Sequence, residues 1–264
     1  MDPKRPLTRL GERLAAYLSR PRDGVGFAPT STPDTLARSV RRGDVLLVDG
    51  TSRISVAIKY LTQSSWSHAA LVTADARHAP DRPLEACTVI ESDLNEGVRT
   101  LPLTSYAGHH TRICRPVGLG EADIERVVCY AEARIGHQYD LENVIDLARY
   151  LVPTPPVLTR WRRRLLALGS GDPTKAICSS LIAGAFQSVR YPILPRITMQ
   201  ASSDPQCREC YRELLHIRHH SLFTPRDFDI SPYFRIVKPT VEAAFDPRAL
   251  SWGDDGHGER MPAA

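Results

Sequence analysis

The sequence predicts an α+β protein in which short antiparallel strands form a sheet that packs against helices. Short apolar runs bounded by turn residues follow one another through the first half of the chain, at 43–50, 68–74, 87–92, 97–103 and 111–117. Residues 121–135 have the pattern of an amphipathic helix, which opens with acidic residues and closes at Gly136. A second, more apolar helical run begins at Cys178. Runs of strand length followed by helices are typical of this class.

The remaining elements are shorter or lie outside this central block. We expect a short helix at 55–63, a turn region at 76–83, helices at 139–151 and 178–189, and a late strand at 234–237. The chain divides into an N-terminal helix with its linker (1–40), a main domain (41–240) and a mobile tail (241–264). The linker, residues 21–40, is rich in Pro, Ser, Thr and Gly, and a Pro- and Arg-rich insertion interrupts the main domain at 153–173.

Composition excludes several classes of protein. The chain has 264 residues, of which 42% are hydrophobic and 24% charged, so a buried core can form. The net charge of +4, from 34 Lys and Arg against 30 Asp and Glu, is a mild excess, and no RNA-binding signature accompanies it. We therefore expect no nucleic-acid partner.

The distribution of apolar residues and cysteines predicts a compartment. The first residues contain no continuous apolar segment, which argues against a secretory signal, and no run approaches the length of a transmembrane helix. Six cysteines are scattered along the chain, which is unlike a disulfide framework. We expect a cytoplasmic protein with reduced thiols.

Two segments far apart in sequence carry the chemistry. His68 stands at the head of an apolar strand, and Cys178 stands at the head of an apolar helix. A thiol at a helix N-terminus lies near unpaired backbone N–H groups and the positive end of the dipole, and both favour the thiolate. An imidazole that takes the thiol proton would complete an activated nucleophile. Each residue by itself has a structural alternative, as a hydrogen-bonded histidine and a small buried apolar group.

A carboxylate is expected beside the histidine. If the strands at 68–74 and 87–92 form a hairpin, opposed residues have numbers that sum to about 160, and opposed residues share a face of the sheet. His68 then lies near Glu91 or Ser92, and Glu91 can fix the tautomer of the imidazole. A slipped register would substitute Asp93, which shares the face of Glu91, whereas Glu85 is the weaker choice because it falls in the turn.

Six short motifs occur in a particular order along the chain. They are Gly43–Leu47, Trp66–Val72, Val89–Ser92 with Gly97-Val98, Gly136–Asp140, Ile177–Ile182, and Thr224–Phe228 with Ser231-Pro232. Their order resembles that of the circularly permuted, NlpC-like cysteine hydrolases of papain fold, specifically the YaeF/YiiX group, over residues 43–238. Position 180 departs from the pattern, because it holds Ser where the family commonly has Glu.

The resemblance implies a fold and a set of roles. The fold would be a circularly permuted papain-like one, with an antiparallel barrel-like sheet packed on the helix that bears the nucleophilic cysteine. Cys178 would be the nucleophile, His68 the general base and Glu91 the orienting group. Tyr139 would donate a hydrogen bond to the substrate or the oxyanion, beside the backbone N–H of Cys178. The implied function is a cysteine hydrolase that cleaves an amide bond of a peptide or conjugate through an acyl-Cys178 intermediate.

A lipid-directed activity is the alternative within the enzymes. Residues 161–168 combine Trp161 and three arginines with apolar residues, a composition suited to an anionic membrane surface. Peripheral membrane contact through 153–173 or the N-terminal helix would favour a thioesterase, phospholipase or acyltransferase of the lecithin–retinol acyltransferase type. The acyl substrate would then be a lipid and not a peptide or small molecule. A solvated basic helix explains the same residues equally well.

A second cluster has the spacing of zinc ligands. A structural zinc site would use Cys207, Cys210, His216 and His220, and the other interpretation is a reduced surface CxxC with unrelated histidines. Catalysis by a thiol requires no cofactor. An alternative of another class is therefore a zinc-stabilised, non-catalytic binding module in which Cys178 is merely packed.

Overall fold

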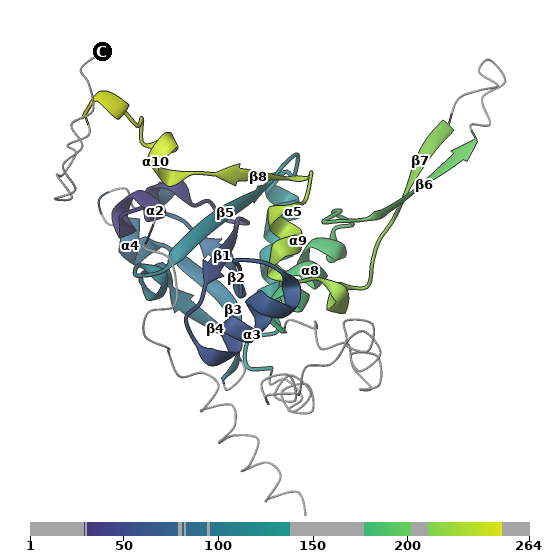
Figure 1. Ribbon diagram of the computed structural model, residues 1–264, viewed down its shortest axis with the longest axis horizontal. Helices are drawn as coiled ribbons and strands as arrows, with labels where there is room; N and C mark the ends of the chain where they lie inside the picture. Colours follow the sequence, from purple (N-terminus) through teal and green to yellow (C-terminus); the bar gives the residue numbers. More distant parts are fainter. Residues whose placement is uncertain are drawn as a thin grey trace, which may run out of the picture.

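The computed structural model describes residues 29, 31–78, 81, 83–93, 96–137, 177–201 and 211–249. At its centre lies a six-stranded antiparallel sheet with strand order β4-β3-β2-β1-β5-β8 (Figure 1). The strands of this sheet are β1 (Val45–Asp49), β2 (His68–Ala74), β3 (Thr88–Asp93), β4 (Gly97–Pro102), β5 (His110–Pro116) and β8 (Phe234–Val237). The α-helices are α2 (Pro33–Ser39), α3 (Arg53–Thr62), α4 (Pro83–Ala86), α5 (Glu121–Glu132), α8 (Ile177–Ser188), α9 (Pro225–Asp229) and α10 (Pro239–Glu242). Short 3₁₀ helices are η1 (Ala76–His78), η2 (Leu103–Tyr106), η3 (His220–Leu222) and η4 (Pro247–Ala249).

The predicted α+β class and all strands predicted for the central block are confirmed. Strand β2 has the predicted bounds, and the ends of the others differ by at most two residues. The two helices predicted at 121–135 and 178–189 are α5 and α8. The helices predicted at 1–20 and 139–151 and the insertion at 153–173 lie outside the described residues.

The barrel-like closure of the sheet is wrong for the part of the chain that the structure describes. Strands β4 and β8 form opposite edges and do not pair with each other. The outer side of β4 is met instead by the chain that follows α5. The N–H of Val98 donates to the carbonyl of His137 (3.0 Å), and the N–H of Gly136 donates to the carbonyl of Val98 (2.8 Å). These bonds use the backbone groups of β4 that closure would require.

Both faces of the sheet are buried, which explains why its strands are continuous apolar runs and do not alternate with polar residues. One face packs on α5, α8 and α9, through a cluster that includes Leu47, Leu71, Ile90, Ile182 and Phe186. The other face packs on α2, α4 and η2, through Leu46, Val72, Val89, Leu36 and Leu103. Helices thus lie on both sides of the sheet (Figure 1).

Helix α8 lies close to its neighbours because one turn carries a glycine. A Cβ on Gly184 would come within 2.8 Å of the hydroxyl oxygen of Tyr130 in α5. The absence of a side chain therefore lets α5 and α8 approach each other, and the apolar residues of α8 reach β2 and β3.

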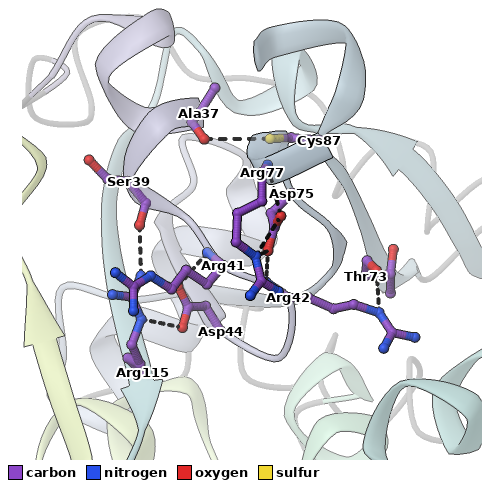
Figure 2. Close-up of polar contacts among 10 residues, drawn as sticks. All are labelled: Ala37, Ser39, Arg41, Arg42, Asp44, Thr73, Asp75, Arg77, Cys87 and Arg115. Carbon is purple, nitrogen blue, oxygen red and sulfur yellow. Dashed lines mark hydrogen bonds and ion pairs between the residues drawn. The ribbon is translucent and has the colours of Figure 1, made fainter. Parts of the chain in front are cut away.

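A polar network fixes the turn that leads into β1 (Figure 2). The buried Asp44 carboxylate accepts from the guanidinium of Arg115 (2.7 and 2.9 Å) and from the N–H of Arg41 (2.8 Å). Gly43 before it has φ +88°, and a Cβ there would meet Ile124 at 2.9 Å. The Gly-Asp pair is therefore required by backbone conformation and by this network.

The linker interpretation does not hold for residues 33–39, which form α2. Thr32 caps this helix by accepting from the N–H of Thr35, Pro33 opens it, and Leu36 and Ala37 are buried. Pro33 stands at the first helical position, where proline favours a helix start and not a linker. The packing of Leu36 makes α2 part of the main domain.

Four further elements were not predicted. Helices α4 and α9 are short, and strands β6 (Arg196–Ala201) and β7 (Tyr211–His216) form a separate two-stranded sheet that extends away from the main body (Figure 1). In the predicted mobile tail, α10 ends at Glu242 and η4 covers 247–249. No helix among the described residues is long and apolar enough to cross a membrane.

Candidate active site

The imidazole of His68 lies against the carboxylate of Glu91. The distance from His68 Nε2 to Glu91 Oε2 is 2.6 Å. Strands β2 and β3 pair with Leu71 opposite Ile90, so the numbers of opposed residues sum to 161, one more than expected. In this register Glu91 is the diagonal neighbour of His68 on the same face, and such neighbours remain within reach of long side chains. The structure thus brings together the two residues that the hairpin argument paired.

Two residues that the sequence analysis missed hold the Glu91 carboxylate. The Arg99 guanidinium donates to Glu91 Oε1 (2.7 and 2.9 Å), and the Tyr106 hydroxyl donates to Oε2. Burial opposes ionisation of Glu91, but the hydrogen bonds and charge of His68, with Tyr106 and Arg99, lower its pKa to about 2. The carboxylate is therefore ionised at any ordinary pH. Arg99 lies directly opposite Glu91 across β3 and β4. The short connection between these strands fixes their register, and this register could have predicted the pairing from the sequence.

Cys178 is the second residue of α8, and its thiol is buried beside His68. Its side chain interacts with the His68 ring and with the backbone N–H of Ala69. Burial would raise the pKa of Cys178, but the charge and hydrogen bond of His68 outweigh this and lower it below the ordinary value of 9.0. Burial would likewise lower the pKa of His68, yet the Cys178 thiolate and Glu91 raise it well above 6.5. The pair is therefore most stable as thiolate and imidazolium.

The other free thiols of the described residues differ from Cys178. Burial raises the pKa of Cys87 to about 11 and raises that of Cys114 further. Cys129 is exposed, and its hydrogen bond to Glu125 raises its pKa as well. Of the four free cysteines described, Cys178 is the one whose pKa is lowered.

Tyr139 lies outside the described residues, whose preceding segment ends at His137 beside β4. Ser180 is buried in the first turn of α8. Asp93, the alternative partner of His68, lies 4.0 Å from Arg99 and accepts from the N–H of Glu96 (3.1 Å).

Half of the predicted zinc ligands can be placed. Cys207 and Cys210 lie outside the described residues. His216 shares a hydrogen bond of 2.8 Å with Thr198 across β6 and β7, and the ring of His220 lies 4.2 Å from that of His219. Within the described ranges no group of three or more His, Cys, Asp or Glu could hold a metal ion. The zinc site stays a prediction.

The Glu91 contacts lead to a prediction about catalysis. We expect Glu91→Gln to slow acylation of Cys178 by about 10²- to 10⁴-fold, because a neutral amide no longer stabilises the imidazolium. The rate of acyl-enzyme formation measures this effect. The control is Glu125→Gln, at an exposed carboxylate of α5 that pairs with Arg42, for which we expect little change. Equal losses in the two variants would contradict the orienting role of Glu91.

Residues 39–150 match the model of a family described as permuted papain-like amidase enzyme, YaeF/YiiX, C92 family. This segment contains His68 and Glu91, whereas Cys178 lies beyond it. No curated protein matches the chain.

Among solved structures, the chain is similar to the metalloprotein yiiX from Escherichia coli O157:H7 (DUF1105). The identity is 15% and the TM-score 0.45, over 75% of this chain and 97% of that one. The match of the family model confirms the resemblance inferred from the sequence motifs over residues 39–150, where the chain matches the permuted papain-like amidases of the YaeF/YiiX group.

Proposed function

We propose that this protein is a cysteine hydrolase that cleaves an amide bond of a peptide or conjugate through an acyl-Cys178 intermediate. The observation that carries the proposal is the position of the His68 imidazole, which interacts with the Glu91 carboxylate and with the Cys178 thiol. A nucleophile, a base and a group that orients the base are the three parts such chemistry requires. The family match supports an amidase.

The acylation step follows from the charged state of the pair. The Cys178 thiolate attacks the carbonyl carbon, a C–S bond forms, and the π electrons of the carbonyl move to its oxygen. When this tetrahedral intermediate collapses, the C–N bond breaks and the His68 imidazolium gives its proton to the leaving amine. His68 is then neutral and the acyl group is a thioester of Cys178.

Deacylation uses the same residues in reverse. Neutral His68 takes a proton from water as the water oxygen attacks the thioester carbonyl. The C–S bond then breaks, the acid leaves, and the thiolate and imidazolium are restored. Glu91 stabilises His68 whenever it is protonated, because its own carboxylate stays ionised. These steps use only groups of the chain itself, so the proposed reaction needs no cofactor.

The oxyanion of each tetrahedral intermediate needs hydrogen-bond donors. The backbone N–H of Cys178 lies in the first turn of α8, where N–H groups have no partner within the helix. We assign Tyr139 as a second donor. The lipid-directed alternative depends on residues 153–173, which lie outside the described part of the chain, and no observation on the described residues favours it.

Covalent capture tests this function directly. We expect a panel of activated acyl esters to leave an acyl group on the protein, detected by intact mass and located on Cys178 by peptide mapping. Cys129 is the internal control, because it is more exposed but its pKa is raised. An acyl group found on Cys129 as readily as on Cys178 would contradict the proposal and favour a binding module.

A further inference from the structure

Ser92 carries a buried hydroxyl without a partner. The residue is 4% exposed, and its Oγ has no hydrogen bond within the part of the chain that the structure describes. A buried hydroxyl that lacks a partner reduces the stability of the folded protein. Such a group is therefore expected where a bound molecule supplies the missing partner.

The strand pairing places the Ser92 side chain on the face of the sheet that α8 covers. Ser92 lies directly opposite Val98, and opposed residues share a face. Val98 belongs to the same buried cluster as Leu181 and Ile182 of α8. The hydroxyl of Ser92 thus points to the helix that bears Cys178 and away from the face that holds Glu91.

The direction of the strands places Ser92 at the N-terminal end of α8. Strand β3 runs antiparallel to β2, so its last residues lie beside the first residues of β2. The N–H of Val72 bonds to Asp44 of β1, and alternate N–H groups of a strand point in opposite directions. The N–H of Ala69 therefore points toward β3, where it meets the Cys178 sulfur. In the register that pairs Leu71 with Ile90, Ser92 of β3 comes level with Ala69, on this same side of β2 and on the face that α8 covers.

We infer that the Ser92 hydroxyl binds the substrate of the proposed hydrolase, by donating a hydrogen bond to the carbonyl oxygen that Cys178 attacks. That oxygen must lie beside the Cys178 sulfur and the N–H groups of the first turn of α8, toward which the face of Ser92 is directed. The hydroxyl gains its partner when substrate binds, and the bond strengthens as the oxygen becomes negative. This inference rests on the proposed function and adds a donor from β3 to those of α8.

A purely structural hydroxyl looks different in this fold. Thr73, on the neighbouring strand, is also buried, at 8% exposed, but its hydroxyl lies 3.0 Å from that of Thr88. Removing the Thr73 hydroxyl breaks an existing hydrogen bond, whereas removing that of Ser92 breaks none among the described residues. Thr73 is therefore the matched control for Ser92: both hydroxyls are buried, but only that of Thr73 has a partner among the described residues.

The experiment compares Ser92→Ala, Ser92→Thr and Thr73→Val in the full chain. For each variant, acyl-enzyme formation from an activated ester, alkylation of Cys178 by iodoacetamide and the melting temperature are measured. We expect Ser92→Ala to slow acylation by about tenfold or more, as loss of an oxyanion donor does. Its alkylation rate should not change, because alkylation forms no oxyanion, and its melting temperature should be equal or higher. Ser92→Thr retains a hydroxyl and should recover much of the acylation rate.

The outcomes separate this inference from the function on which it rests. If wild type is acylated and Ser92→Ala is acylated equally fast, the role of Ser92 is wrong and the hydrolase stands. If Ser92→Ala melts at a lower temperature and loses alkylation together with acylation, as a structural residue would, the role is likewise wrong. If wild type forms no acyl-enzyme, the proposed function itself fails. Thr73→Val should melt at a lower temperature and keep its acylation rate.

Discussion

Replacing Cys178 by alanine is expected to abolish the acyl adduct and to reduce hydrolysis by at least about 10⁴-fold, because losing the nucleophile removes the covalent route entirely. Activity that remained would come from groups that only bind and polarise the substrate. The measurement is turnover of the best acyl ester, together with intact mass.

Two controls make the Cys178→Ala result specific. Cys129→Ala removes an exposed thiol, and we expect it to retain full activity. The melting temperature of Cys178→Ala should stay near that of wild type, since Cys178 fills little volume and its partners His68 and Glu91 remain hydrogen-bonded. An adduct that persists in Cys178→Ala would place the nucleophile elsewhere and exclude the proposed mechanism.

Replacing His68 by alanine is expected to slow acylation by about 10³- to 10⁵-fold, because the thiol loses the group that takes its proton. The pH dependence shows the cause. Burial is the largest influence on Cys178 and by itself raises its pKa, and the imidazolium of His68 is the strongest of the groups that reverse the shift, ahead of the N–H of Ala69 and the hydroxyl of Ser179. We therefore expect the pKa of Cys178 to be higher in His68→Ala than in wild type.

Alkylation by iodoacetamide as a function of pH measures this shift. Wild type should be alkylated at Cys178 well below pH 9, because the thiolate persists there. His68→Ala should react slowly at neutral pH and recover only as the pH rises through the higher pKa of its thiol. His109→Ala is the control, because its ring lies edge-on to Tyr106, 6.1 Å between centroids, and should leave the profile unchanged. Identical profiles for wild type and His68→Ala would show that His68 does not set the thiolate.

The sequence could place the strands and the two long helices because those signals are local. The apolar run that begins at His68 lies between turn residues, and α5 opens with acidic residues, so neither needs a distant partner to be recognised. The nearness of His68 and Glu91 was also predictable, since a hairpin of these two strands brings the start of one beside the end of the other. The face was decided only by the structure: a sum of 160 places His68 opposite Ser92, whereas the observed sum of 161 places it opposite Asp93, with Glu91 diagonal to it on the same face.

Other features depended on contacts between segments far apart in the chain. Helix α2 is held by the burial of Leu36 against a distant face of the sheet, which outweighs its loop-like composition. The sheet stays open because the chain after α5 takes the outer groups of β4 at Val98. No local pattern encodes either contact.

The candidate site likewise has features that local sequence predicted and features that depend on distant contacts. The sequence by itself determined which residue types carry the chemistry, a thiol at a helix start and a histidine at a strand start. Only the tertiary structure decided that Arg99 and Tyr106 hold Glu91, that the N–H of Ala69 meets Cys178, and that Ser92 lies on the same side of β2. The reason is physical: the pKa of a buried group depends on the charges and donors packed around it, and long-range packing brings these together.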